Sequence, residues 1–283
     1  MSIVGENKLW QRFLYFYVPL GIFVIFLLLP FYWMLVVSIR PTQDLLKQSP
    51  NPFLIYSATL GHYRFLFEDT AFSTWMKNTF IVTVSATLLS LFCAILIGYA
   101  LGRFQFRLAN TLGAAIFIAY LVPPTLLFIP LAQIISEYGL YNRYWALIFT
   151  YPTFLIPFAS WLLMGYFRTI SHELEDAALV DGASRLQAMR QIVLPLALPG
   201  ILSAGIFCFT LSWNEFLYAL VFMGTAEMKT VPVGVVSDLI KADTFMWGPL
   251  MAAGILGSVP VAIAYSFFVD NYVSGLTAGA TKG

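Results

Sequence analysis

The sequence predicts an all-α fold, that of a polytopic membrane protein with six transmembrane helices. Two observations predict this class. Of the 283 residues, 60% are hydrophobic and only 10% are charged, whereas a soluble domain carries about 25% charged residues. The apolar residues also gather in long uninterrupted segments, and about 20 such residues are enough to cross a bilayer as a helix. The chain therefore has room for several membrane helices joined by modest loops.

The first four spans are bounded by charged residues, because a charge in the middle of a bilayer is costly. Uncharged segments of 27, 25, 29 and 24 residues lie at positions 13–39, 78–102, 108–136 and 144–167. Each is long enough to cross a membrane. The first is too long for the core of a signal peptide and no small-residue cleavage pattern follows it, so we expect it to remain as a helix.

Two further apolar segments, at about 200–223 and about 249–269, complete the six. The fifth contains one acid, Glu215, and the sixth ends at Asp270. Six spans place both termini on the same side of the membrane. With the termini inside, eight Lys and Arg residues are cytoplasmic and seven are not, so the positive-inside rule favours cytoplasmic termini only slightly.

Small residues inside the spans are expected to serve helix packing. Gly98 and Gly102 are four residues apart, a spacing that lets a neighbouring helix approach closely. Both cysteines, Cys93 and Cys208, lie in apolar segments. This placement indicates packing rather than a disulfide framework or a metal site.

Residues 168–199 form a polar segment that holds a large share of the charge. Ser171 can cap a helix, and a glycine, Gly182, is placed to end it. Acidic side chains are favourable in the first turns of such a helix because they face the positive end of its dipole. Three acids occupy these turns: Glu173, Glu175 and Asp176.

A second helix is expected directly after this turn. Ser184 and Gln187 have the spacing of a capping box, and Pro195 is expected to stop the helix. A helix pair that displays acids and small alanines is suited to docking against a partner protein. The alternative is an amphipathic pair lying on the membrane surface, although such helices are usually basic on their polar face.

The acidic helix belongs to a longer pattern of matching residues. It comprises EDAALVDGA at 175–183, IVLP at 192–195 and Pro199. This pattern resembles the EAA loop of the membrane subunits of bacterial binding-protein-dependent ABC importers. WNEF at 213–216 and the Gly-rich tail at 273–283 resemble the carbohydrate, maltose-type subgroup, and in particular its second permease type. The resemblance covers about residues 12–283, with Met189 standing where the family usually has Phe.

The resemblance implies the type I ABC importer permease fold in a bacterial inner membrane, with both termini cytoplasmic. Residues 1–71 would hold an N-terminal tail, the first helix and a periplasmic loop. Residues 72–270 would form the five-helix transmembrane domain that includes the 168–199 coupling loop. Residues 271–283 would be a cytoplasmic tail. Residues 224–248 would be periplasmic and face the solute-binding protein.

The resemblance also implies that the 168–199 loop inserts into a cleft of an ATPase subunit. Glu175 would pair with an ATPase arginine, and Gly182 would form the turn. The tail near Lys282 would approach the ATPase close to its nucleotide. The complete set of docking residues that it implies is Glu175, Asp176, Ala177, Ala178, Asp181, Gly182 and Lys282.

The function expected from this resemblance is that of a permease subunit of an ATP-driven importer for a carbohydrate or polyol-type solute. The implied partners are a second homologous permease, two ATPase subunits, a solute-binding protein and membrane lipid. ATP and Mg are expected on the ATPase, since the nearest approach to a phosphate-binding loop here has Met228 where glycine is needed. This chain is expected to bind no cofactor and, with a net charge of only +1, no nucleic acid. No catalytic constellation points to an enzyme.

The competing class is an ion-coupled secondary transporter or a channel. Ion coupling usually leaves acids or histidines inside the membrane, and the six apolar segments contain only Glu215. This residue lies roughly 22 Å along its helix from Gly200. Asn214 and Glu215 are therefore candidates for the translocation pathway, and for Glu215 a gating role and a structural hydrogen bond are equally open.

Overall fold

A computed structural model describes residues 9–46, 51–242 and 244–280, and nearly all of its regular elements are helices. The chain divides into two compact units, one formed by residues 1–70 and 238–258 and the other by residues 71–237 and 259–283. Among the described residues, four helices are long and apolar enough to cross a membrane: Phe13–Ile39, Phe72–Arg103, Tyr144–Thr169 and Trp247–Phe267. Two further helix pairs are each bent at a break, and the spans number up to six if each bent pair counts as one span. The predicted all-α, six-span fold is confirmed.

The first unit is built around a long apolar helix, α2. Its elements are α1 (Leu9–Arg12), η1 (Phe13–Tyr17), α2 (Val18–Ile39), α3 (Thr42–Leu46), α4 (Gly61–Glu68), β1 (Ile240–Lys241), β2 (Thr244–Phe245) and the start of α16 (Trp247–Ala280). Most side chains of α2 are exposed and apolar, which suits a helix surrounded by lipid. The end of α2 is fixed by a hydrogen bond of 2.7 Å between His62 Nε2 and the Arg40 carbonyl.

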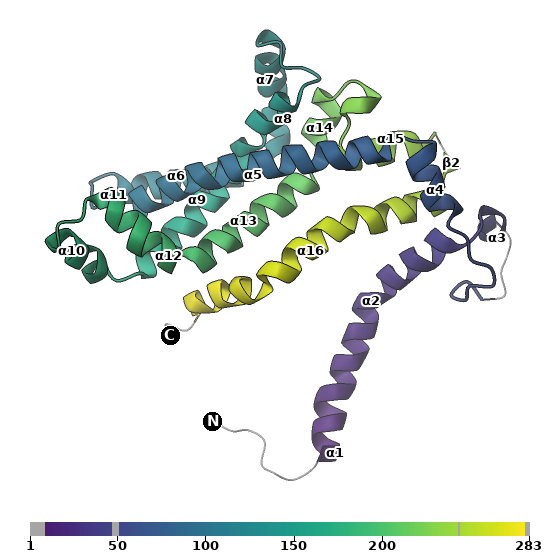
Figure 1. The fold of residues 1–283 in the computed structure, drawn as a ribbon, viewed down its shortest axis with the longest axis horizontal. Helices are drawn as coiled ribbons and strands as arrows, with labels where there is room; N and C mark the ends of the chain where they lie inside the picture. The colour runs from purple at the N-terminus through teal and green to yellow at the C-terminus, as the bar shows by residue number, and fades with distance from the viewer. Residues whose placement is uncertain (1–8, 47–50, 243, 281–283) are drawn as a thin grey trace. The chain divides into compact units, whose positions relative to one another are not determined.

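The second unit is a bundle in which α5, α9 and α13 pack side by side (Figure 1). Its helices up to the 168–199 loop are α5 (Phe72–Arg103), α6 (Ala109–Leu121), α7 (Pro124–Glu137), α8 (Tyr144–Thr150) and α9 (Pro152–Thr169). The later ones are α10 (His172–Val180), α11 (Arg185–Ala188), η2 (Met189–Val193), α12 (Leu194–Leu196), α13 (Leu198–Trp213), α14 (Leu217–Phe222), η3 (Ala226–Met228) and α15 (Val231–Leu239). With 32 residues, α5 is about 48 Å long, so the bundle has two well-separated ends.

Close contact between α5 and α9 depends on two glycines. A Cβ atom added at Gly98 would lie 2.9 Å from Leu163 Cβ, and one added at Gly102 would lie 3.1 Å from the Met164 carbonyl oxygen. Neither position has room for a larger side chain. The packing role predicted from the spacing of the two glycines is confirmed.

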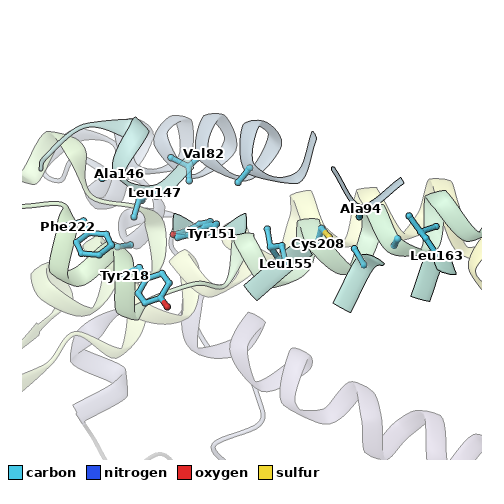
Figure 2. Close-up of a cluster of buried hydrophobic side chains, with 14 of the residues drawn as sticks. Val82, Ala94, Ala146, Leu147, Tyr151, Leu155, Leu163, Cys208, Tyr218 and Phe222 are labelled. Atoms are coloured by element: carbon cyan, nitrogen blue, oxygen red, sulfur yellow. The ribbon is translucent and has the colours of Figure 1, made fainter. Parts of the chain in front are cut away.

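Buried side chains of α5, α8, α9 and α13 form the core of this unit (Figure 2). Tyr151, Leu155 and Leu163 lie along its length, and Cys208 is buried beside them. Lipid tails are as apolar as leucine, so contacts of this kind stabilise a membrane bundle through van der Waals packing. Cys208 packs in this core, in agreement with its predicted role, and Cys93 is half-buried.

Two of the predicted spans are broken rather than continuous. The third consists of α6 and α7, bent by 91° where Pro123 and Pro124 interrupt the backbone hydrogen bonds. The helical segment Arg185–Leu196 meets α13 at 75°, just before Pro199. The predicted fifth span at 200–223 is also interrupted, since α13 ends at Trp213 and α14 begins at Leu217.

The second helix of the 168–199 loop continues past the residue predicted to stop it. Pro195 lies in its final turn, α12, which ends at Leu196. The turn before Pro195 is the π-helical segment η2. Because proline has no N–H group, it cannot make the usual backbone hydrogen bond of a helix. A wider π-helical turn precedes Pro195, and the helix continues through it.

Candidate functional site

Helix α10 is capped at its start and ends in a glycine turn, both formed by residues next to it in the sequence. Ser171 Oγ accepts a hydrogen bond of 3.3 Å from the Glu173 N–H group, as predicted for the helix cap. Gly182 has a φ of +88°, a backbone conformation in which glycine is favoured because it has no Cβ. The Ala183 N–H group then bonds to the Ala178 carbonyl at 2.9 Å. These bonds make a short, well-defined helix and turn.

The following helix begins with the predicted capping box. The Ser184 N–H group donates to Gln187 Oε1 at 2.7 Å, and the Gln187 N–H group donates to Ser184 Oγ at 3.3 Å. Both bonds satisfy donors that a helix start leaves unpaired. Elements α10 to α12 together form a capped helix pair, which we call the loop helices (172–196). They lie at the end of the bundle where α5 ends (Figure 1).

Apolar side chains project from the loop helices. Val180 is 86% exposed, Leu186 is 60% exposed and Leu174 is 47% exposed. Exposed acids accompany them: Glu173, Asp176 and Asp181. Exposed apolar groups bordered by polar residues are typical of a surface that binds another protein or a membrane.

Glu175 points inward, unlike its acidic neighbours. Its carboxylate is bound by Arg103, with distances of 2.8 Å from both Nε and Nη2 to Oε2. The Tyr99 hydroxyl donates to the other carboxylate oxygen. The family resemblance implies that Glu175 pairs with an arginine of the ATPase. In this structure its carboxylate is instead paired with Arg103 of the same chain.

Arg103 also holds the connection between α9 and α10. Its Nη1 atom donates to the Ile170 carbonyl at 2.7 Å, and its Nη2 atom donates to the Ser171 carbonyl at 3.2 Å. One buried side chain thus joins the end of α5 to the end of α9 and to the start of α10. In the sequence Arg103 marks only the boundary of the second span, and nothing local indicates this partner 72 residues away.

The other residues implied in docking lie on or near the surface. Asp176, Ala177, Asp181 and Gly182 are exposed, and Ala178 is half-buried. Lys282 lies outside the described residues. The structure thus brings all of the described docking residues together on α10 and its turn, with Glu175 on the inner side.

Asn214 and Glu215 follow the end of α13. Glu215 accepts hydrogen bonds from the N–H groups of Tyr218 at 2.8 Å and Ala219 at 3.1 Å, so it caps the start of α14. The amide of Asn214 donates to the Thr210 carbonyl at 2.8 Å. These bonds give both residues structural partners, and their role in the pathway stays a prediction.

The segment after α14 is held at the opposite end of α5 from the loop helices. Asn142 Oδ1 accepts hydrogen bonds from the N–H groups of Gly224 and Thr225 at 3.0 and 3.1 Å. The Asn78 amide donates to the carbonyls of Glu227 and Lys229 at 2.7 and 2.9 Å. The backbone of this segment, residues 224–231, is therefore held by side chains from α5 and from the connection between α7 and α8.

The two ends of the bundle present different structures. Within the residues that the structure describes, no three His, Cys, Asp or Glu side chains are grouped so that they could hold a metal ion. A long helix connects an exposed helix pair at one end to an anchored loop at the other. This arrangement defines a helical membrane protein with an exposed helix pair at one end.

Comparison with known proteins identifies the family of this chain. The family described as binding-protein-dependent transport system inner membrane component matches residues 94–277, and the chain belongs to this family. The inner membrane ABC transporter permease protein YcjP of Escherichia coli (strain K12) is 36% identical over 99% of this chain and 100% of that protein. The trehalose/maltose transport system permease protein MalG of Thermococcus litoralis is 34% identical over 90% of this chain and 92% of that protein.

A solved structure has the same fold. It is a chain of a bacterial ABC transporter involved in the import of the acidic polysaccharide alginate, with a TM-score of 0.79 over 95% of this chain and 99% of that chain. The sequence identity is 23%, so the likeness is one of fold. The predicted type I ABC importer permease fold is confirmed, and the chain is a permease subunit of an ABC transporter.

Proposed function

We propose that this chain is one of two homologous permease subunits of an importer for a carbohydrate or polyol-type solute. A periplasmic or extracellular binding protein delivers the solute, and two separate ATPase subunits bind ATP and Mg. The solute class is supported by the 34% identity of this chain to the trehalose/maltose transport system permease protein MalG. The absence of a phosphate-binding loop from the sequence supports separate ATPases.

The observation that carries this proposal is the exposed surface of the loop helices. Leu174, Val180 and Leu186 offer apolar contacts, and the acids beside them can form charge-assisted pairs with arginines of an ATPase. The exposed acids of α10 are repelled by anionic lipid, which disfavours the alternative that this helix lies on the membrane. In this proposal the loop helices and both termini are cytoplasmic, and Lys282 reaches toward the ATPase.

Glu175 acts in this proposal by holding the docking helix rather than by reaching the ATPase. Its ion pair with Arg103 attaches α10 to α5, so a movement of a docked ATPase displaces the end of α5. At the far end of α5, Asn78 holds residues 224–231, which face the binding protein. Nucleotide binding thereby shifts the population between inward-open and outward-open states through one continuous helix.

Asp176→Arg tests the docking step. Its side chain is exposed on α10, so the variant reverses a surface charge and leaves the Arg103–Glu175 pair intact. With the other subunits co-expressed, we expect the ATPase to bind the variant about tenfold more weakly, a change of ~1.4 kcal/mol. The measurement is the amount of ATPase that co-purifies with the permease pair across a salt series.

The matched control is Glu68→Arg, which reverses an exposed acid of α4 that pairs with its neighbour Arg64. This control should retain the wild-type amount of ATPase. Equal retention by Asp176→Arg and the wild type would contradict docking through the loop helices.

A further inference from the structure

A basic cleft lies beside the loop helices, where the end of α5, the start of α6 and the end of α9 meet. It has a volume of about 410 Å³. Its polar lining residues are Arg103, Gln105, Arg107, Asn110, Arg168 and His172. Among the described residues that line it, none is acidic.

Two of the three arginines in this cleft carry uncompensated charge. Arg103 is neutralised by Glu175, but neither Arg107 nor Arg168 forms an ion pair within residues 9–46, 51–242 and 244–280. Arg168 Nη2 is held by two neutral acceptors, the Leu101 carbonyl at 3.3 Å and Asn110 Oδ1 at 3.1 Å. A fixed guanidinium beside a second free one forms a site for an anion.

The cleft lies where two apolar spans end. Arg103 is the last residue of α5, and Arg168 is next to the last residue of α9. Phe104 and Phe106 also line the cleft and are exposed. Arginines and aromatic rings at the ends of membrane helices are typical of the headgroup layer, and basic pockets between such helices bind anionic lipid headgroups.

We propose that this cleft binds the phosphate group of an anionic phospholipid through Arg107 and Arg168, with Phe104 and Phe106 against the acyl region. His172, the first residue of α10, also lines the cleft. A bound headgroup therefore contacts the first turn of the docking helix. The proposal concerns lipid and does not depend on ATPase docking, so each can fail without the other.

Native mass spectrometry of the purified full chain tests this site. The delipidated chain is titrated in neutral detergent with dioleoylphosphatidylglycerol or dioleoylphosphatidylcholine. We expect preferential binding of the phosphatidylglycerol, weakened about fivefold by Arg107→Gln and by Arg168→Gln. Arg107→Lys, which keeps the charge, should retain most of the binding. Arg190→Gln, which removes an exposed arginine outside the cleft, should bind like the wild type.

Three outcomes of the lipid titrations would overturn the proposal: equal binding of the two lipids, unchanged binding by Arg107→Gln, or an equal loss in Arg190→Gln. Inorganic phosphate serves as a competitor. If millimolar phosphate displaces the lipid completely, the cleft takes a free anion and the lipid assignment is wrong. Arg107 is exposed, so its variant should unfold at the wild-type temperature, which separates lost binding from lost structure.

Discussion

The guanidinium of Arg103 and the carboxylate of Glu175 form a buried ion pair, with 2.8 Å between Nη2 and Oε2 and side chains that are 1% and 7% exposed. The pair attaches α10 to α5, although the acids around Glu175 on the same helix face outward. The acids of the loop therefore fall into two groups, one buried and one exposed. Glu175 holds the helix in place, and the other acids of the loop are exposed, as the proposed docking requires.

We expect Glu175→Leu to detach α10 from α5 in the isolated chain. Removing one member of a buried ion pair leaves an unpaired charge and costs about 3–5 kcal/mol. Hydrogen exchange of the amides of residues 172–180 measures this loss. The double variant Arg103→Leu with Glu175→Leu should be less damaged than the single variant, because no unpaired charge remains. Equal exchange in the wild type and Glu175→Leu would contradict an anchoring role within the chain.

Ser184→Ala should loosen the start of the second loop helix. The variant removes the hydroxyl that accepts from the Gln187 N–H group, and the loss of such a cap costs about 1 kcal/mol. Amide exchange at residues 185–188 should accelerate about fivefold. Ser184→Thr keeps the hydroxyl and is expected to exchange like the wild type; an equal acceleration in both variants would show that the cap is not the cause.

Gly98→Ala should destabilise the contact between α5 and α9. The added methyl would lie 2.9 Å from Leu163 Cβ and 3.0 Å from the Met164 nitrogen, and overpacking of this kind costs about 1–3 kcal/mol. Thermal unfolding in detergent measures the effect. Gly165→Ala, on α9, meets nothing within 4 Å and should unfold no earlier than the wild type. A Gly98→Ala midpoint at the wild-type value would contradict the close approach.

Asn142→Gly should release residues 224–231. Asn142 has a φ of +58°, which glycine also adopts freely, so the variant removes the side-chain hydrogen bonds without straining the backbone. Two N–H groups lose their acceptor, at about 1 kcal/mol each, and amide exchange at Gly224 and Thr225 should accelerate. Asn142→Asp keeps an acceptor oxygen and should remain protected; if both variants exchange alike, the carbonyl oxygen is not the anchor.

Glu215→Gln distinguishes a structural carboxylate from an ion-coupling one. An amide oxygen can still accept from the Tyr218 N–H group, so we expect the assembled importer to keep its ATP hydrolysis and its stimulation by the binding protein. Glu215→Leu, which cannot accept, should lose stability because the start of α14 is left uncapped. Loss of transport in Glu215→Gln with unchanged stability would support ion coupling instead.

Features that depend on neighbouring residues were predictable from the sequence. Ser171, Gly182 and the Ser184–Gln187 pair act over three or four residues, and each one has the predicted hydrogen bonds or backbone conformation. The spans were likewise predictable because charge is excluded from the bilayer. The spacing of Gly98 and Gly102 also indicated the close approach of a neighbouring helix. Two small residues on one face permit this approach whatever the sequence of the neighbour.

Features that depend on distant residues were not predictable in this way. Arg103 and Glu175 are 72 residues apart, and an arginine at the end of a span normally faces the headgroup layer. Pro123 and Pro124 remove two backbone donors at the break between α6 and α7, but the angle of 91° depends on how these two helices pack. Proline at position 195 did not end its helix, because the π-helical turn before it changed the hydrogen-bond pattern.

Photo-crosslinking from Val180 tests the central claim most directly. A photoreactive amino acid replaces Val180, at the exposed tip of α10, or Ile22, an exposed residue of α2, in cells that express the complete importer. Docking of the loop helices predicts a covalent adduct with the ATPase subunit from position 180 and none from position 22. Adducts with lipid alone from both positions would contradict docking and place these helices on the membrane surface.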